Sequence, residues 1–193
     1  MGRTALALAR LLLREGAEPF VSEIKGKEER EALTAGLDDL GISWECGGHS
    51  LRALKNAALV IPSPGVPPSA ELVRDARSRG IPVMGEMEFA HRFAGSKILA
   101  ISGTNGKTTT TELARALVDA CGHTVLLAGN NDMPLSAAVM AEPAPEYIVL
   151  EVSSYQLELA DTFRPWLAAL LNITPDHLAW HGGMGGYLPL IHN

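Results

Sequence analysis

The sequence predicts an α/β protein in which two open parallel sheets, each with crossover helices, follow one another along the chain. Three observations carry this prediction. Short apolar strand-like segments alternate with helical patterns throughout the 193 residues. A Gly-Ser pair at Gly95–Ser96 interrupts the alternation, which puts a domain boundary at about residue 95 and predicts domains at residues 1–94 and 95–193. In the second part, each apolar strand is followed at once by a cluster of polar residues.

The elements of the first part are short. Leucines and alanines at helical spacing predict a helix from Thr4 to Arg14, which Gly16 ends. We further expect a strand at Pro19–Glu23, a strand at Ala57–Ile61, a helix at Ala70–Arg79 closed by Gly80, and a short strand then a helix in "IPVMGEMEF". This alternation is typical of a Rossmann-like parallel sheet.

The second part repeats the alternation more clearly. The expected order is strand Lys97–Ser102, helix Lys107–Ala120, strand Thr124–Ala128, a helix around Pro134–Met140, strand Tyr147–Val152 and strand Trp166–Ile173. The clusters that follow the strands read "GTNGKTT", "GNND", "EVSSYQ" and "NITPDH". Ligands bind at the carboxyl ends of the strands in open parallel sheets, so we expect these clusters to converge on one cleft.

Composition narrows the possible functions. The chain is 47% hydrophobic and 20% charged, with a formal charge of −6, and no cluster of Lys and Arg tracks a nucleic-acid backbone. A nucleic-acid partner is therefore disfavoured. No apolar run approaches the roughly 20 residues of a membrane-spanning helix, so we expect no membrane insertion. Two distant cysteines, Cys46 and Cys121, match no metal spacing and fit a reducing cytoplasm.

The segment from Gly103 to Thr109 has the features of a phosphate-binding loop. Gly103, Thr104, Asn105 and Gly106 lie between a strand and a helix, where backbone N–H groups and the helix N-terminus attract phosphate oxygens. Lys107 can reach the outer phosphates of ATP, and the Thr108 hydroxyl can help to hold Mg²⁺, with Thr109 beside it. Ile101 stands where the strict motif has its first glycine. The alternative is a strand-to-helix turn with a capping threonine.

Two further residues are candidate metal ligands. Glu151 closes the strand "YIVLEV" near the loop, where its carboxylate suits Mg²⁺; a solvated strand end is the alternative. His177 follows the next strand beside Asp176, and from the sequence a structural role is equally open.

The remaining candidates would contact a polar substrate. Asn130, Ser153 and Gln156 follow strands and can form hydrogen bonds, although capping of the strand ends explains Ser and Asn nearly as well. In the first part, Glu23 lies ~20 residues after "MGRT", the interval at which a dinucleotide fold meets a ribose. "SPG", Ser63-Pro64-Gly65, can present N–H groups to a phosphate or form a plain turn.

The motifs "GTNGKTTTTE", "LAGN", "LEVSSYQLE" and "LNITPDHL", in this order and spacing, resemble the Mur ligases. These are ATP-dependent amide-forming enzymes of peptidoglycan synthesis, and "SSYQLE" points to the D-glutamate-adding branch. The resemblance runs along nearly the whole chain and implies a P-loop NTPase-type fold for residues 95–193. It also implies a cytoplasmic enzyme that uses ATP and Mg²⁺ on UDP-N-acetylmuramoyl-L-alanine and D-glutamate, and whose full-length form is monomeric.

The resemblance also implies roles for individual residues. Lys107 would bind the γ-phosphate, Thr108 and Glu151 would hold one Mg²⁺, and His177 would hold a second. The muramoyl substrate would contact Asn130, Ser153 and Gln156, and its uridine diphosphate would lie along Thr4, Glu23, Lys25 and Ser63 to Gly65.

The sequence departs from the family pattern in three places. Asn131 and Asp132 replace the end of "GNIG", which puts an extra carboxylate beside an anionic substrate, and Ile191 stands in place of the family's carbamylated lysine. The first strand of the uridine domain and the later parts of the enzyme are not in this sequence. We therefore expect little or no ligase activity from the isolated chain. Another Mur-type ligase, such as the diaminopimelate- or lysine-adding one, and a catalytically dead nucleotide-binding remnant stay open as alternatives.

Overall fold

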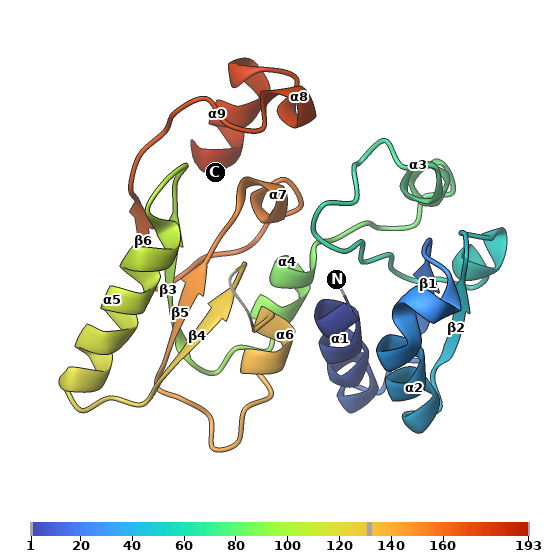
Figure 1. The fold of residues 1–193 in the computed structure, drawn as a ribbon, viewed down its shortest axis with the longest axis horizontal. Coiled ribbons are helices and arrows are strands. Elements are labelled where there is room, and N and C mark those ends of the chain that lie inside the picture. The colour runs from blue at the N-terminus through green and yellow to red at the C-terminus, as the bar shows by residue number, and fades with distance from the viewer. Residues whose placement is uncertain (1, 131–132, 193) are drawn as a thin grey trace. The chain divides into compact units, whose positions relative to one another are not determined.

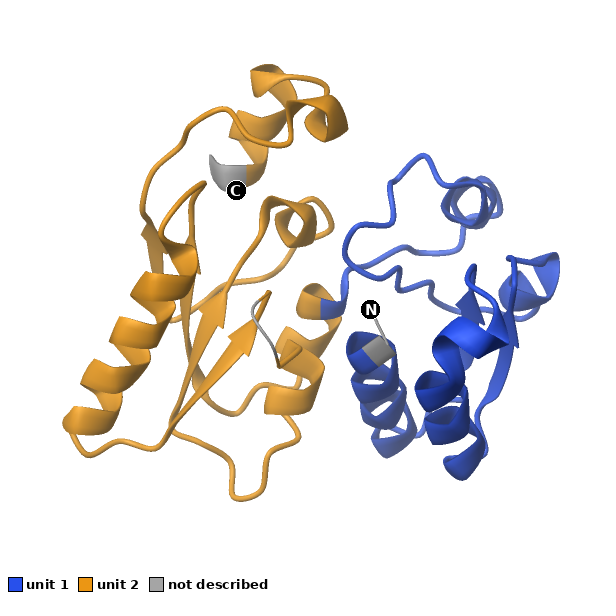
Figure 2. Ribbon diagram, in the orientation of Figure 1, with its two compact units in different colours: residues 1–86 blue, residues 87–193 orange. Residues whose placement is uncertain are grey.

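A computed structural model describes residues 2–130 and 133–192. The chain divides into two compact units, residues 1–86 and 87–193, each of mixed helices and parallel strands (Figure 2). The α/β class is confirmed. The division falls at the start of helix α4 (Glu86–His91), and the boundary expected near residue 95 lies after this helix.

The first unit packs two helices against a pair of strands. Its elements are α1 (Gly2–Arg14), β1 (Phe20–Glu23), the 3₁₀ helix η1 (Lys27–Arg30), α2 (Glu31–Asp39), β2 (Ser43–Cys46), the 3₁₀ helix η2 (Leu51–Leu54) and α3 (Glu71–Ser78). The strands are parallel, with Phe20 opposite Ser43 and Glu23 opposite Cys46. A core of Ala9, Leu33, Leu37 and Ile42 holds α1 and α2 together with the strands. Both strands therefore deliver their carboxyl ends, and Glu23, to the same edge.

Two features of this unit differ from the prediction. Helix α2 and strand β2 were not predicted, because "EALTAGLDD" carries Thr and Gly at helical positions and "SWEC" is short and polar. The strand predicted at Ala57–Ile61 is wrong: only an isolated bridge joins Val60 to Val83. Pro62 and Pro82 flank this bridge, and proline lacks the N–H that would extend the ladder.

The second unit is a four-stranded parallel sheet between helices (Figure 1). Its strands are β3 (Lys97–Ser102), β4 (Val125–Gly129), β5 (Tyr147–Glu151) and β6 (Leu167–Leu170), in the order β4-β5-β3-β6. The helices are α4, α5 (Lys107–Ala120), α6 (Leu135–Ala138), α7 (Ser154–Leu157), α8 (Leu178–His181) and α9 (Met184–His192).

The strand order decides where the helices lie. The chain passes from β3 over β5 to β4 and then turns back from β4 to β5. Because parallel crossovers are right-handed, this reversal puts α5 on one face of the sheet and α6 on the other. Because all four strands are parallel, their carboxyl ends lie at one edge of the sheet, as predicted.

The core lies on the two central strands. Ile148, Val149 and Leu150 of β5 and Ile98 and Ile101 of β3 are buried. Strand β6, at the edge, is shorter than the predicted Trp166–Ile173, and its Leu167 and Leu170 are each 45% exposed.

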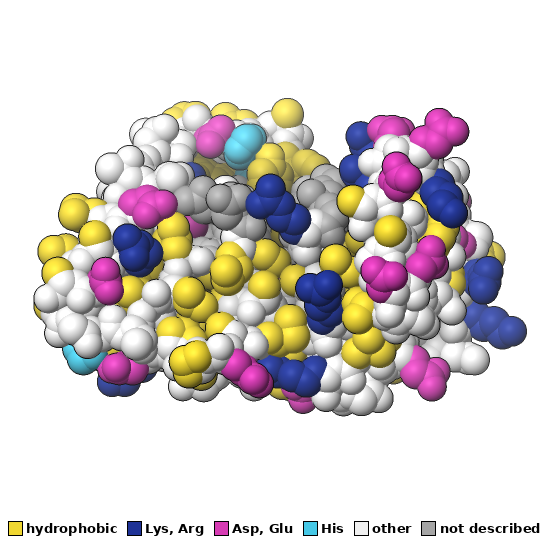
Figure 3. Space-filling view, turned by 60° about the horizontal axis from the view of Figure 1, so that its bottom comes forward, with side chains coloured by type: hydrophobic (Ala, Val, Ile, Leu, Met, Phe, Trp, Pro, Cys, Tyr) yellow, Lys and Arg dark blue, Asp and Glu magenta, His cyan; other side chains and the backbone are white. Residues whose placement is uncertain are grey.

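The surface carries both charges. On the face shown in Figure 3, Lys and Arg side chains are interspersed with Asp and Glu. Within the described residues, no helix combines the length and the apolar character needed to cross a membrane.

Candidate functional site

The candidate phosphate loop connects β3 to α5. Gly106, immediately before the helix, has a φ of +82°, and Gly103 has a φ of +142°. A Cβ on Gly103 would stand only 3.1 Å from the carbonyl oxygen of Asn172. The Lys107 ammonium folds back over the loop and donates to the carbonyl oxygens of Gly103, at 2.7 Å, and Thr104, at 2.9 Å. The loop is a closed turn with the Lys107 ammonium at its centre. Thr109 lies exposed on the first turn of the helix.

Three of the sequence-predicted residues meet directly at the ends of β4 and β5. The Thr108 hydroxyl donates to Glu151 Oε2 at 2.9 Å, and Asn130 Nδ2 donates to Glu151 Oε1 at 3.0 Å. Glu151 is only 2% exposed, so the solvated strand end considered from the sequence is wrong. Gly129 permits this approach, since a Cβ there would lie 2.1 Å from the carbonyl oxygen of Glu151.

A second segment clamps the loop, and sequence reasoning missed its residues. Asn172 accepts from the Asn105 N–H and donates to the Asn105 carbonyl oxygen, both at 2.9 Å. The Thr104 hydroxyl accepts from the Thr174 N–H at 2.9 Å and donates to the Thr174 carbonyl oxygen at 3.0 Å. The buried Tyr187 hydroxyl lies 3.1 Å from the same Thr104 oxygen. Asn172 and Thr174 belong to the cluster "NITPDH", whose polar residues were the available signal.

His177 has contacts of its own, with residues other than Glu151. It caps α8 with a left-handed φ of +48°, and its ring lies 5.0 Å from that of Tyr155 and 3.6 Å from the Asp176 carboxylate. Among the described residues, no hydrogen bond or ion pair joins His177 to Thr108 or Glu151. The structure thus brings together Thr108, Asn130 and Glu151 but not His177.

Ser153 and Gln156 serve as a helix cap in this structure. The Ser153 N–H and hydroxyl both donate to Gln156 Oε1 at 2.9 Å, which forms a capping box at the start of α7. Both side chains are buried. The sequence analysis considered capping of the strand ends by Ser and Asn, and the cap observed here is instead that of a helix.

In the first unit, Glu23 is the most constrained of the predicted residues. Its carboxylate accepts from the Lys25 N–H at 3.1 Å and from Arg30 Nε at 2.8 Å. Partial burial raises the pKa of Glu23, but these hydrogen bonds and the Arg30 charge outweigh it, so the net pKa is lowered. Glu23 is thus held as a carboxylate at the end of β1, with its orientation set by Arg30.

The other predicted residues of this unit are less fixed. The Lys25 ammonium pairs with Glu29 at 3.0 Å on the surface, and Thr4 lies half-buried on α1. Ser63-Pro64-Gly65 forms a turn that the Val66 N–H closes on the Ser63 carbonyl oxygen at 3.0 Å, with a Gly65 φ of +89°. Asn131, Asp132 and the side chain of Ile191 lie outside the described residues.

Chemically, the edge of the second unit offers an anion site beside a cation site. Backbone N–H groups at the start of α5 and the Lys107 ammonium suit phosphate, and the Thr108 hydroxyl and Glu151 carboxylate are hard oxygen donors that suit Mg²⁺. Within the described residues, no group of three or more His, Cys, Asp or Glu side chains gathers around one point. A cation here would share its ligands between this pair and phosphate oxygens.

Two family models match the two parts of this chain. Residues 1–85 match the family model described as Mur ligase MurD-like, N-terminal domain, and residues 101–189 match the one described as Mur ligase middle domain. The UDP-N-acetylmuramoylalanine–D-glutamate ligases of Acidobacterium capsulatum and Frankia casuarinae are 42% and 45% identical over 188 residues, 97% of this chain in each case. Those matches cover 41% and 40% of the relatives, so the chain spans about two fifths of the length of these curated proteins.

Solved structures share the fold. The UDP-N-acetylmuramate:L-alanyl-γ-D-glutamyl-meso-diaminopimelate ligase of Neisseria meningitides superposes with a TM-score of 0.61 over 97% of this chain and 62% of its own, at 17% identity. The UDP-N-acetylmuramate–alanine ligase of Thermotoga maritima gives a TM-score of 0.56 over 99% of this chain and 44% of its own, at 22% identity. At these identities the likeness concerns the fold alone.

Proposed function

This chain belongs to the Mur ligase family, and we propose that it serves the ATP-dependent addition of D-glutamate to UDP-N-acetylmuramoyl-L-alanine in cytoplasmic peptidoglycan synthesis. The observation that carries the proposal is the junction of Thr108, Asn130 and Glu151 beside the Lys107 loop. In this reaction the substrate carboxylate takes the γ-phosphoryl group of ATP, and the amine of D-glutamate then displaces phosphate from the acyl phosphate to form the amide.

Each residue of the junction has a part that its contacts support. Lys107 would exchange its two loop carbonyls for phosphate oxygens, which places its charge on the group being transferred. Thr108 and Glu151 would hold Mg²⁺, which supplies charge neutralisation between two anionic substrates. Asn130 fixes the other oxygen of Glu151, and by the family resemblance it would contact the muramoyl substrate. His177 would hold a second Mg²⁺. Because His177 does not contact Thr108 or Glu151, only the bound substrates would link this second Mg²⁺ to the first.

In the first unit, Glu23, Lys25 and the Ser63–Gly65 turn would bind the uridine diphosphate, with Thr4 at the start of α1. The Glu23 carboxylate can accept from a ribose or uracil donor, and Arg30 keeps it ionised and oriented. The N–H groups of the turn and the N-terminus of α1 are the anion-binding features of this edge.

Calorimetric binding to the 193-residue chain tests the proposal. We expect Mg·ATP and UDP-N-acetylmuramoyl-L-alanine each to bind, and Lys107→Ala to weaken Mg·ATP binding by about 100-fold because a charged phosphate contact is lost. Lys55→Ala, which removes an exposed lysine of the first unit, is the matched control and should leave ATP binding unchanged. Equal ATP affinity for the Lys107→Ala variant and the unaltered chain would refute the loop assignment.

A further inference from the structure

Helix α9 lies beyond the carboxyl edge of the sheet and reaches the phosphate loop through the Tyr187 side chain (Figure 1). Tyr187 is 3% exposed, and its hydroxyl lies 3.1 Å from the Thr104 hydroxyl, 83 residues away in the sequence. The roles proposed above for the loop residues leave this contact without a function.

The hydrogen bonds of Thr104 show which of the two hydroxyls donates. A hydroxyl has one proton to donate and two lone pairs that accept. The Thr104 hydroxyl donates its proton to the Thr174 carbonyl oxygen at 3.0 Å and accepts from the Thr174 N–H at 2.9 Å, so one lone pair remains. The Tyr187 O–H therefore donates to that lone pair. This bond completes the hydrogen bonding of the Thr104 hydroxyl and satisfies the donor of a buried tyrosine.

Thr104 in turn fixes the cation of the loop. Its N–H donates to the Asn172 carbonyl oxygen at 3.1 Å, and its own carbonyl oxygen accepts from the Lys107 ammonium at 2.9 Å. The hydroxyl, the N–H and the carbonyl oxygen of Thr104 are thus all engaged. Because the Lys107 ammonium is held by that carbonyl oxygen, a displaced Thr104 would also displace the charge that we propose meets the outer phosphates of ATP.

Tyr187 is itself held by its neighbours. Its ring packs against that of His181, with 5.4 Å between the ring centroids, and His181 Nε2 lies 3.0 Å from the Ser154 hydroxyl at the start of α7. A Cβ on Gly186 would collide with the His181 carbonyl oxygen, so the backbone just before Tyr187 lies directly against α8. A rigid support of this kind presents the Tyr187 hydroxyl to Thr104 in one position.

We propose that Tyr187 is a positioning residue for nucleotide binding: its hydrogen bond to Thr104 holds the phosphate loop, and with it the Lys107 ammonium, in the shape that receives Mg·ATP. The hydroxyl contacts Thr104 and acts on the nucleotide only through it. The identity of the nucleotide rests on the proposed function, whereas the effect of the bond on the loop needs no ligand. The two parts can therefore be tested separately.

Tyr187→Phe, which removes this hydroxyl and keeps the ring, tests the proposal in the 193-residue chain. Without nucleotide, NMR should show the Thr104 and Asn105 amide hydrogens exchanging with solvent about fivefold faster, because the loss of one neutral hydrogen bond lets the loop open more often. Calorimetry should show Mg·ATP binding about fivefold more weakly, since a smaller fraction of the loops has the binding shape.

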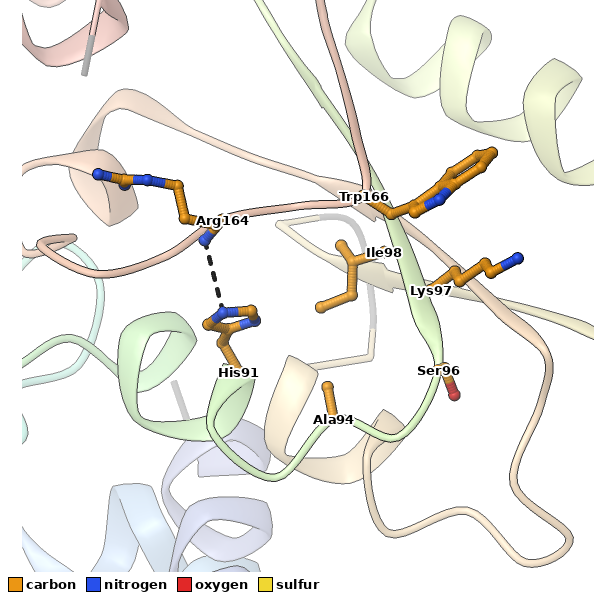
Figure 4. Close-up of a pocket in the computed structure, with 7 residues that line it drawn as sticks. All are labelled: His91, Ala94, Ser96, Lys97, Ile98, Arg164 and Trp166. Carbon is orange, nitrogen blue, oxygen red and sulfur yellow. Dashed lines mark hydrogen bonds between the residues drawn. The ribbon is translucent and has the colours of Figure 1, made fainter.

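Tyr147→Phe is the matched control, because it makes the same change in the same unit at the other edge of the sheet. Tyr147 begins β5 and packs against Trp166, whose side chain lies beside Lys97 at the amino end of β3 (Figure 4). This variant should change neither the amide exchange of the loop nor its affinity for Mg·ATP.

A double substitution separates the hydrogen bond from other effects of Tyr187. Thr104→Val removes the acceptor and should weaken Mg·ATP binding by itself. If the two residues act through one bond, adding Tyr187→Phe to Thr104→Val should cause no further loss of affinity. Losses that add in full would overturn the proposal.

Unchanged exchange of the loop amides in Tyr187→Phe would overturn the proposal, as would unchanged Mg·ATP affinity. If the unaltered chain does not bind Mg·ATP, the proposed function fails at this loop, and the exchange rates alone decide whether Tyr187 holds it. A further measurement covers a Tyr187→Phe variant that does not fold. In the unaltered chain, the Tyr187 hydroxyl proton should exchange slowly and show a nuclear Overhauser contact with Thr104, and the absence of that contact would overturn the proposal.

Discussion

Replacing Glu88 by Gln should strongly destabilise the second unit. Glu88 lies on α4, its side chain is 1% exposed, and its carboxylate accepts from three successive backbone N–H groups, at Asp161, Thr162 and Phe163, over 2.9–3.1 Å. The Thr162 hydroxyl donates to it as well. One carboxylate thus anchors the loop between α7 and β6 to the helix that begins the unit.

The size of the effect follows from the donors. Glutamine keeps one oxygen acceptor but turns an NH₂ group toward N–H donors, so about two charge-assisted hydrogen bonds are lost. At ~1.5 kcal/mol each, this amounts to about 3 kcal/mol. Because 1 kcal/mol shifts the melting temperature of a domain near 100 residues by roughly 4 °C, the midpoint should fall by ~10 °C.

The pH dependence gives a second readout. Burial raises the pKa of Glu88, but the hydrogen bonds from Thr162 and its neighbours lower it more, so the net pKa is lowered. A lowered carboxyl pKa contributes stability that is present above the unfolded value of about 4.3 and is lost as pH falls through the folded pKa. The stability gap between the unaltered chain and Glu88→Gln should therefore be constant at neutral pH and shrink below about pH 4.

Thermal melts followed by circular dichroism between pH 3 and 8 measure both effects. Glu112→Gln is the control, because Glu112 forms an exposed and therefore weak ion pair with Arg115 at 3.9 Å. This substitution should shift the midpoint by less than about 2 °C. If Glu88→Gln shifted the midpoint at pH 7 as little as this control does, the Glu88 carboxylate would not anchor the loop. The same would follow if the stability difference between the unaltered chain and Glu88→Gln were as large at pH 3 as at pH 7.

Three further predictions concern the candidate site. Gly129→Ala should lower the free energy of unfolding by about 4 kcal/mol or more, because its Cβ would lie 2.1 Å from the Glu151 carbonyl oxygen and its φ is +108°. Denaturant titration measures this loss, and a loss below about 1 kcal/mol would contradict the close approach of the strands. Asn172→Ala should weaken Mg·ATP binding about fivefold in calorimetry by freeing the loop at Asn105, and unchanged affinity would refute the clamp. Glu151→Gln should abolish the Mg²⁺ dependence of ATP binding. The melting temperature measured without Mg²⁺ should not fall. If ATP binding still depended on Mg²⁺, Glu151 would not be a ligand of the metal.

The second unit was more predictable from sequence than the first. Its central strands are continuous apolar runs that end abruptly in polar clusters, a pattern that burial on both faces dictates. Hence the ends of β3 and β5, and with them the loop and Glu151, fell at or within one residue of their predicted places. In the first unit, segments such as "SWEC" expose polar residues and adopt a strand only because β1 lies beside them.

Sequence reasoning missed some residues of the candidate site for a different reason. Asn172 and Tyr187 act on Asn105 and Thr104, 67 and 83 residues away, through contacts that no local pattern encodes. Conversely, Ser153 and Gln156 stand three positions apart, which is the local spacing of the helix capping box that they form.

The environment of Glu151 bears most directly on the choice between a metal ligand and a solvated strand end. Its carboxylate is 2% exposed, and its described hydrogen-bond partners, Thr108 and Asn130, are neutral. Among the ion pairs of the described residues, none involves Glu151, in contrast to Glu23, which Arg30 neutralises. Burying an unneutralised carboxylate costs several kcal/mol, far more than two neutral hydrogen bonds return. Such a group is favoured where a cation completes it, and the loop that Lys107 closes is an anion site beside it. The pairing of Glu151 with that loop, rather than either motif alone, is therefore the strongest argument for a metal–nucleotide site at this edge.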